Sequence, residues 1–567
     1  MFDNTIKLTK FMLKREKITS TAWILLMVIL NFLIVLLMGT ALLGDAESIT
    51  EFMAMLENPA LLAMVGPLYS MDFATMGALY TLMMLVFMGI TIGAMNIFLV
   101  VRHTRADEEA GRYEVLRSLP CGRLATVNAA MLTAVIVNVI SAVLFGFTMW
   151  LAMHIVGDPM GFESAMLWGV GLGAVGLAFA GAAALFSQLS SNSRGATGFS
   201  FMIMGLFYFL RAGADASPDS VGFLAFLGPL GILSRTWAYV HDYWWPVLLI
   251  LAFAAVFTAL AYWICSFRDI DQGIVPARPG KASGGLLMKS TFGLNFRLLR
   301  TSIIVWIIIL FVTGLSYSIV LSDIDTFIAG NDFYRGLLLG PTGLLDLIDA
   351  DAPVEVIAEQ INSVLNAAGL SIVQMFSNMI GFMMAMISAI PVIMFITKAK
   401  GEEKAIRAEL LFATPTSKVK YLLGLVIFAF IMAPLLQSAQ AIGLYSVART
   451  AIENPADLPF SFLMRSSLVY VPAIWVIGGI TVLLVGLFPR RTGFIWAYYG
   501  FTFFAMMYGR MLPEIAWIAN LTPLGFVPQL PLDEIVPWVL VVKVVIAFAL
   551  VVLGLFFYRK RDINVVK

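Results

Sequence analysis

The feature that most constrains this sequence is a series of twelve apolar runs, each about 20 residues long. A helix of that length spans the roughly 30 Å of hydrocarbon in a bilayer, whereas a soluble core needs no such runs. The runs begin near Thr21, Gly77, Ala125, Glu163, Ala196 and Trp245 in the first half of the chain and near Ser302, Val373, Tyr421, Arg465, Gly493 and Trp538 in the second. With 60% hydrophobic and 13% charged residues, the chain is predicted to be an all-α polytopic membrane protein with twelve transmembrane helices and lipid as its main solvent.

The distribution of Lys and Arg predicts how the chain crosses the membrane. Of the 36 Lys and Arg residues, 29 lie at the two termini or in every second loop, and short loops rich in these residues stay in the cytoplasm. Both termini are therefore expected in the cytoplasm of a protein of the cell membrane. The first run is too long for a signal peptide and is expected to be retained. The net charge of +1 lacks the concentrated basic field that a nucleic-acid partner requires.

The chain repeats itself at an offset of 293 to 295 residues. The stretch RADEEAGRYEVLRSLP (Arg105 to Pro120) aligns with KGEEKAIRAELLFATP (Lys400 to Pro415). Further matches are Thr197-Gly198 with Thr492-Gly493, Pro229-Leu230-Gly231 with Pro523-Leu524-Gly525, and Arg268-Asp269-Ile270 with Arg561-Asp562-Ile563. We predict two six-helix halves, residues 1–279 and 280–567, joined by the linker PARPGKASGG. Because each half has an even number of spans, the halves are expected to be parallel repeats with sites between them.

Each half also opens with an amphipathic stretch, at Ile6 to Ile18 and at Leu286 to Arg300. Stretches that mix Phe, Leu and Met with Lys and Arg form helices in the cytoplasmic interface, or serve only as basic flanks of the next span. Recurrence in both halves favours two interfacial helices.

The repeated charged stretch is predicted to be a short helix. Glu108 and Arg112 are four residues apart, as are Glu403 and Arg407, so each pair is expected to form an ion pair along one helix face. A proline then ends each helix. An isolated charged run would be read as a solvated loop. Because the same spacing occurs twice, we favour two docking helices for identical or similar soluble partners.

With this repeated charged stretch, the sequence resembles the permease subunits of ABC-2 type exporters. It most resembles the long, duplicated permeases of antibiotic and multidrug exporters. In that family a coupling helix between spans two and three docks on the ATPase. Its pattern is matched by Glu108, Gly111, Arg112, Glu114, Leu116 and Pro120, and again by Glu403, Arg407, Glu409, Leu411 and Pro415. The two PLG loops resemble the external re-entrant segments of the family, and the amphipathic starts resemble its elbow helices.

The resemblance implies that eight of these residues couple the chain to the ATPase: Glu108, Arg112, Glu114, Pro120, Glu403, Arg407, Glu409 and Pro415. Ile406 departs from the family pattern, because it stands where the pattern has the glycine that Gly111 supplies, and this puts equal docking of the two halves in doubt.

The chain shows no ATP site of its own. Gly280-Lys281 is followed by Ala282, where a phosphate-binding loop needs a hydroxyl to hold Mg. The resemblance therefore implies two copies of a separate ABC ATPase that hold ATP and Mg, with no cofactor bound by this chain. The chain itself is expected not to be an enzyme.

Metal and catalytic sites are not expected. The three histidines lie on different loops, and Cys121 and Cys265 lack ligand spacing and are expected to be free thiols. GLGAVG (Gly171 to Gly176) fits a dinucleotide fingerprint but lies inside the fourth apolar run. Together with Gly169 and Gly173, which form a G-x-x-x-G face, it is interpreted as a site of close helix packing.

Four ionisable residues lie near the outer ends of spans: Arg211, Arg510, Glu514 and Lys543. A charge at the bilayer centre costs about 2.5–3.5 kcal/mol. We therefore expect these side chains to reach out to the interface, and alternatively Arg211 and Arg510 to line an exit vestibule.

The favoured function is export of an amphiphilic compound, such as an antibiotic or a drug, by alternating access driven by ATP. Spans two and five would face spans eight and eleven along the substrate path. The predicted lining comprises Phe201, Phe207, Phe209, Phe503, Phe504, Arg211 and Arg510.

Two alternatives remain open. A twelve-span, ion-coupled secondary antiporter would share the parallel repeat, but it usually needs a carboxylate in mid-membrane, and no run has one near its centre. A membrane-embedded enzyme would need clustered His, Asp or Glu, which the runs do not contain.

Overall fold

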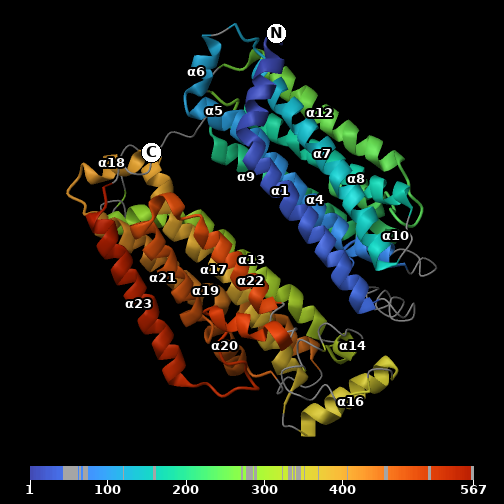
Figure 1. The fold of residues 1–567 in the computed structure, drawn as a ribbon, viewed down its shortest axis with the longest axis vertical. Helices are drawn as coiled ribbons and strands as arrows, with labels where there is room; N and C mark the ends of the chain where they lie inside the picture. Colours follow the sequence, from blue (N-terminus) through green and yellow to red (C-terminus); the bar gives the residue numbers. More distant parts are fainter. Residues whose placement is uncertain are drawn as a thin grey trace. The chain divides into compact units, whose positions relative to one another are not determined.

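The computed structural model consists of helices and their connections, without a strand among the residues it describes. It describes the chain except for residues 43–61, 63–64, 68–74, 119, 158–160, 217, 270–271, 276–284, 286–289, 322–323, 330–334, 336–338, 340–346, 350–351, 368–369, 405, 453–457, 508–512 and 563–567. The chain divides into two compact units, Met1–Gly280 and Lys281–Lys567, here called unit 1 and unit 2 (Figure 1).

Unit 1 is built around α8, which packs against α4, α7 and α12. Its helices are α1 (Thr5–Leu42), α4 (Met76–His103), α5 (Arg105–Glu109), α6 (Arg112–Arg117), α7 (Ala125–Val156), α8 (Phe162–Leu189), α9 (Ser193–Ala216), α10 (Pro218–Val221), the 3-10 helix η2 (Gly222–Leu227), α11 (Pro229–Ser234) and α12 (Trp245–Phe267).

The glycines of α8 allow it to lie directly against α7. A Cβ atom on Gly169 would lie 2.3 Å from the carbonyl oxygen of Ala142, and one on Gly173 would lie 3.1 Å from that of Asn138. Any larger residue at Gly169 would force the two backbones apart. The packing role predicted for this glycine face is confirmed.

Unit 2 pairs α13 with α19 and α21 with α23, while α17 contacts both α19 and α21. Its helices are α13 (Thr291–Val320), α14 (Ile324–Ala329), α16 (Val354–Ala367), α17 (Ile372–Lys404), α18 (Arg407–Phe412), α19 (Lys418–Ala451), α20 (Phe460–Leu468), α21 (Val471–Leu487), η8 (Pro489–Arg491), α22 (Phe494–Met507), η9 (Pro513–Leu521) and α23 (Pro537–Lys560).

Eleven helical segments among the described residues are long and apolar enough to cross a membrane. The run predicted to begin near Gly493 forms α22, whose 14 residues extend only about 21 Å at 1.5 Å per residue. The chain is a multi-pass membrane protein, and the count of twelve spans stays a prediction.

The amphipathic starts differ from the prediction. Ile6 to Ile18 lies wholly within α1, a single helix of 38 residues, so the prediction of a separate interfacial helix is wrong here. The physical reason is local, because no glycine or proline separates the amphipathic stretch from the apolar run that follows. In unit 2, the described residues 291–300 of the second stretch likewise continue into the span as part of α13.

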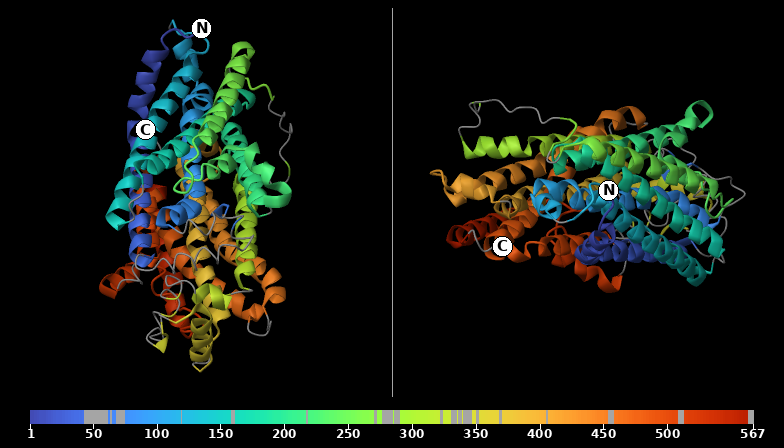
Figure 2. Two further views of the ribbon diagram at one scale, coloured as in Figure 1. Left: turned by 90° about the vertical axis from the view of Figure 1, so that its right-hand side faces the viewer. Right: turned by 90° about the horizontal axis from the view of Figure 1, so that it is seen from above.

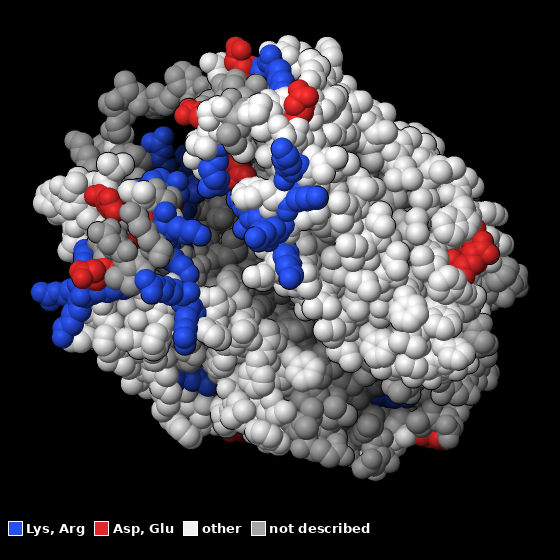
Figure 3. Space-filling model, turned by 45° about the horizontal axis from the view of Figure 1, so that its top comes forward, with Lys and Arg blue, Asp and Glu red and all other residues white. Residues whose placement is uncertain are grey.

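The short helices α5, α6 and α18, which come from the two repeated charged stretches, each lie at an end of their unit. Figure 1 shows α5 and α6 at the end of unit 1 where the chain begins, and α18 at the end of unit 2 where α23 finishes. The other two views show the long helices of each unit running side by side (Figure 2). Figure 3 shows exposed Lys and Arg side chains in clusters, while most of the remaining surface in that view is uncharged.

Candidate functional site

The two repeated charged stretches, Arg105 to Pro120 and Lys400 to Pro415, are here called the first and second coupling segments. In the first, α5 ends before Gly111, and α6 starts immediately after it. Gly111 has left-handed backbone angles of φ 69° and ψ 1°. In the second, Ile406 has nearly the same angles, φ 63° and ψ 0°, just before α18. The two segments therefore share one fold, a helix broken by a single left-handed residue.

The ion pairs within the segments differ from those predicted. Arg112 pairs with Asp107 (Nη2 to Oδ1 2.6 Å), and Arg407 pairs with Glu402 (Nε to Oε2 2.6 Å). Each partner is five residues away rather than four, so the predicted pairs of Arg112 with Glu108 and of Arg407 with Glu403 are wrong. The four-residue rule assumes an unbroken helix, and the left-handed residue between the partners interrupts it.

Glu108 turns inward instead. It is only 4% exposed, and its Oε2 atom lies 2.9 Å from Nη1 of Arg105 and 2.9 Å from Nη2 of Arg268, which directly follows α12. The Nε atom of Arg268 also donates to Gln188 in α8 (3.1 Å). The carboxylate thus joins the first coupling segment to the end of the last long helix of unit 1.

Glu403 has the same role in unit 2. It is 6% exposed and pairs with Arg561, which directly follows α23. The hydroxyl of Tyr558 donates to its other oxygen (2.6 Å). The Nη1 atom of Arg561 also donates to the carbonyl oxygen of Val485 in α21 (2.9 Å). The arginines of the repeated Arg-Asp dipeptides therefore have a structural role that sequence reasoning missed.

A second repeated contact is a hydrogen bond to the backbone carbonyl of each of the same two arginines, Arg268 and Arg561. The Nη2 atom of Arg123, just before α7, donates to the carbonyl oxygen of Arg268 (2.8 Å). In unit 2, Nζ of Lys418 at the start of α19 donates to the carbonyl oxygen of Arg561 (2.8 Å). Since Arg123 and Lys418 are themselves 295 residues apart, the repeat extends to this contact.

The outward face of each segment carries the remaining predicted residues. Arg112, Glu114, Pro120, Arg407, Glu409 and Pro415 are all exposed. This outward face is here called the tip of each segment, and sequence reasoning missed its most exposed apolar residue. Val115 is 67% exposed and Leu410 is 76% exposed, and these two residues are equivalent in the repeat. Leu116 and Leu411, which match the family pattern, instead pack against buried residues of their own units.

The amphipathic start of α1 is tied to the first coupling segment. Arg15 forms a two-pronged ion pair with Asp107, at 2.6 and 3.0 Å. The neighbouring Glu16 contacts Nε2 of His103 (2.9 Å) and Nη1 of Arg102 (3.0 Å). The start of α1 and the first coupling segment therefore form one charged assembly.

Arg211 is fully buried, so the expectation that it reaches the interface is wrong. Asp215, one turn further along α9, supplies a counter-charge at 3.1 Å and also pairs with Arg235 (2.7 Å). The ring of Tyr208 lies 4.9 Å from the guanidinium carbon of Arg211. A local counter-ion removes the need to reach water.

Lys543 does not reach the interface either. It is 7% exposed on the face of α23 that carries the buried residues Ala547 and Val551, and its ammonium has no hydrogen-bond partner in the described structure. Arg510 and the side chain of Glu514 lie outside the described residues.

The predicted path residues occupy different surroundings. Phe207 packs in the core of unit 1 between Phe179 and Phe253, with ring centroids 6.5 and 6.3 Å away. Phe201 packs on Phe98. Phe209, Phe503 and Phe504 are exposed. Their part in a substrate path stays a prediction.

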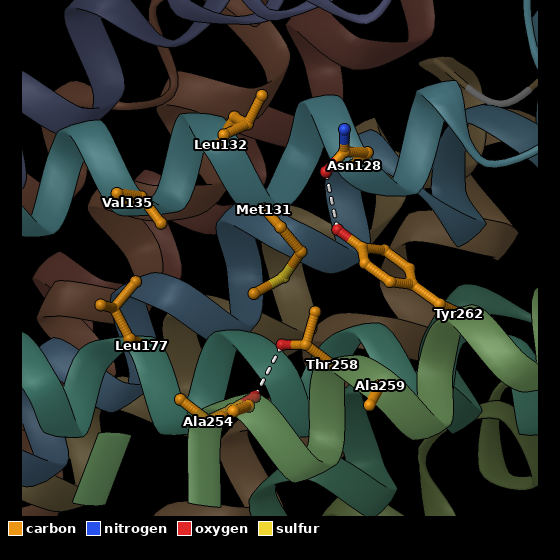
Figure 4. A pocket seen from close by; sticks show the side chains of 10 residues that line it. Asn128, Met131, Leu132, Val135, Leu177, Ala254, Thr258, Ala259 and Tyr262 are labelled. Carbon is orange, nitrogen blue, oxygen red and sulfur yellow. Dashed lines mark hydrogen bonds between the residues drawn. The ribbon is translucent and has the colours of Figure 1, made fainter. Parts of the chain in front are cut away.

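An apolar groove of about 340 Å³ lies between α7, α8 and α12 (Figure 4). Met131, Leu132 and Leu177 form part of its wall. One end is marked by Tyr262, whose hydroxyl donates to Oδ1 of Asn128 (2.7 Å). This lining suits contact with hydrocarbon rather than with a polar solute.

No group of three or more His, Cys, Asp or Glu side chains that could hold a metal occurs among the described residues. Cys121 and Cys265 are both free thiols.

Comparison with known proteins gives two matches. The family profile of the C-terminal domain of the multidrug efflux system permease Rv1217c matches residues 288–357 and 342–559. The chain is also 27% identical over 569 residues to the multidrug efflux system permease protein Rv1217c of Mycobacterium tuberculosis (strain ATCC 25618 / H37Rv), covering 99% of this chain and 96% of that protein. Both matches support a multidrug exporter permease, and the ABC-2 type suggested by the coupling segments is consistent with them.

Proposed function

We propose that this chain is the transmembrane permease subunit of an ATP-driven exporter that moves an amphiphilic or hydrophobic compound, such as an antibiotic or a drug, out of the cell. The observation that carries the proposal is the duplicated coupling segment. Both copies have the same broken helix, the same inward carboxylate and an outward tip in which an exposed apolar residue directly follows an exposed glutamate. Two equivalent tips suit two copies of one soluble ATPase, which would hold ATP and Mg.

In this proposal the two units are parallel six-span repeats in the cell membrane, with both termini in the cytoplasm. α22 counts as the eleventh span, because Thr492-Gly493 before it repeats Thr197-Gly198 in α9. The cargo path runs between the repeats, and closure of the ATPases drives alternating access.

The proposal is tested directly by measuring which energy source drives transport. Inside-out vesicles containing the chain and its ATPase are mixed with the fluorescent amphiphile Hoechst 33342, and uptake of the dye is followed with ATP in the presence of a protonophore. Uptake that needs ATP and survives the protonophore supports the proposal. Uptake that follows a proton or sodium gradient and ignores ATP would replace it with the ion-coupled antiporter.

Substitutions in the two tips test whether the ATPase docks there. Asp in place of Val115 and Leu410 puts a charge at the centre of each tip, and we expect it to lower ATPase affinity by at least about tenfold. The control is Val115→Ile with Leu410→Met, which keeps the apolar surface and should keep binding. Equal binding by both variants would show that the ATPase docks elsewhere.

A further inference from the structure

The inward carboxylates of Glu108 and Glu403 are too deeply buried to contact a docked partner. Each belongs to a coupling segment, yet 4% and 6% exposure leave almost no surface for a partner to touch. Their charges are matched from within the unit instead, by Arg268 and Arg561. The residues that face outward, Val115 and Leu410, are different ones.

The arginines each hold three elements at once. Arg268 joins Glu108 in the first coupling segment, Gln188 in α8 and the side chain of Arg123 before α7. In unit 2, Arg561 joins Glu403 in the second coupling segment, α21 through the carbonyl oxygen of Val485, and α19 through Lys418. In both units the arginine directly follows the last long helix, α12 or α23.

A buried ion pair makes a stiff link between such elements. Separating its partners leaves a charge in a poorly solvated place, so the pair resists opening far more than a surface pair does. A displacement of the coupling segment is thereby passed on to the helix that carries the arginine.

We propose that Glu108–Arg268 and Glu403–Arg561 are transmission clamps, which make α12 and α23 follow the movement of the coupling segments. Their four residues are positioning residues that act after the ATPase has docked. This inference rests on the proposed function, since a clamp needs a motor that moves the coupling segment.

The test uses the full complex of the chain with its ATPase, reconstituted in liposomes. Glu108→Gln with Glu403→Gln removes both charges and keeps the shape of both side chains. The matched control is Glu163→Gln with Glu534→Gln, which removes one exposed carboxylate from each unit outside the coupling segments. The measured quantities are ATPase copurification, ATP hydrolysis and Hoechst 33342 transported per ATP hydrolysed.

The clamp variant is expected to keep its ATPase and to hydrolyse ATP, while transport per ATP falls by about tenfold. The control is expected to stay within about twofold of the unmodified chain in transport per ATP. Loss of the ATPase from the folded clamp variant, or unchanged transport per ATP, would overturn the inference.

Tyr558→Phe provides a milder variant that does not threaten folding. It removes one hydrogen bond to Glu403, and we expect a smaller loss of transport per ATP with normal ATPase binding. Unchanged transport per ATP in this variant would count against the clamp in unit 2. If the unmodified chain itself brings no ATPase, the proposed function has failed, whereas failure of the clamp is seen only in the variants.

Discussion

The two coupling segments adopt one backbone from two different sequences. The left-handed break falls on Gly111 in unit 1 and on Ile406 in unit 2, at φ 69° and 63°. Glycine adopts this conformation without strain, whereas a β-branched residue is forced into it against its own sterics. Because the isoleucine makes the same break, the break is set by contacts around the segment and not by local preference.

The anchoring of the two segments also differs. Glu108 meets two arginines, Arg105 and Arg268, whereas Glu403 meets Arg561 and the neutral hydroxyl of Tyr558. Unit 1 further ties its segment to α1 through Arg15. The two segments therefore keep the same backbone geometry although different side chains neutralise their inward carboxylates.

The largest effect is expected from removing the inward carboxylates. Glu108→Ala takes the shared partner from two buried guanidiniums and should destabilise unit 1 by about 3–5 kcal/mol. Glu403→Ala should cost less, because only one arginine depends on it in unit 2. Thermal unfolding of the purified variants in one detergent checks the order, and an equal or reversed order would contradict the comparison.

The next effect concerns the last long helices, α12 and α23. At the offset of 293 residues that relates Arg561 to Arg268, Lys543 stands where unit 1 has the buried Ile250. Lys543→Met removes a buried cation and should stabilise the chain by about 1–3 kcal/mol. Ile250→Lys should destabilise it by a similar amount. Melting temperatures of the two variants should therefore shift in opposite directions, and a loss of stability in Lys543→Met would show that the ammonium is compensated.

A smaller effect is expected from placing isoleucine in the first break. Gly111→Ile keeps the exposed position but adds a β-branched side chain at positive φ, which should cost about 1–2 kcal/mol. Gly111→Ala serves as a control that adds a Cβ atom at the same positive φ without the β-branch. The free energy of unfolding of the two variants is compared, and no cost in Gly111→Ile would mean that the break can move.

The smallest effect is the reverse change in the second break. Ile406→Gly relieves the backbone strain, but the greater freedom of glycine in the unfolded chain offsets part of the gain. The expected net result is stabilisation of less than about 1 kcal/mol. A loss of stability would instead show that the isoleucine side chain, exposed in this structure, contributes contacts of its own.

The sequence predicts the long helices well and the site only in part. Long apolar runs predict spans because their length as helices matches the thickness of the bilayer. The glycine face of α8 is predicted by the four-residue spacing of its glycines. The break at Ile406 could not be predicted, since it opposes local preference. The inward turn of Glu108 and Glu403 depends on Arg268 and Arg561, which lie some 160 residues away along the chain and which no helical spacing rule can connect.

The apolar tips were missed for a different reason. Val115 and Leu410 stand beside Leu116 and Leu411, and after a broken helix the sequence alone does not tell which member of each pair faces out. Likewise, Arg211 alone suggests a side chain that reaches for water, and only the ion pair with Asp215 explains its burial.

The central claim, that two equivalent tips each dock one ATPase, is tested most directly by native mass spectrometry of the complex purified from its own membrane. We predict two ATPase copies per chain, about one copy when either Val115 or Leu410 is replaced by Asp, and none when both are replaced. A chain that carries no ATPase, or whose two copies survive the double replacement, would contradict the account.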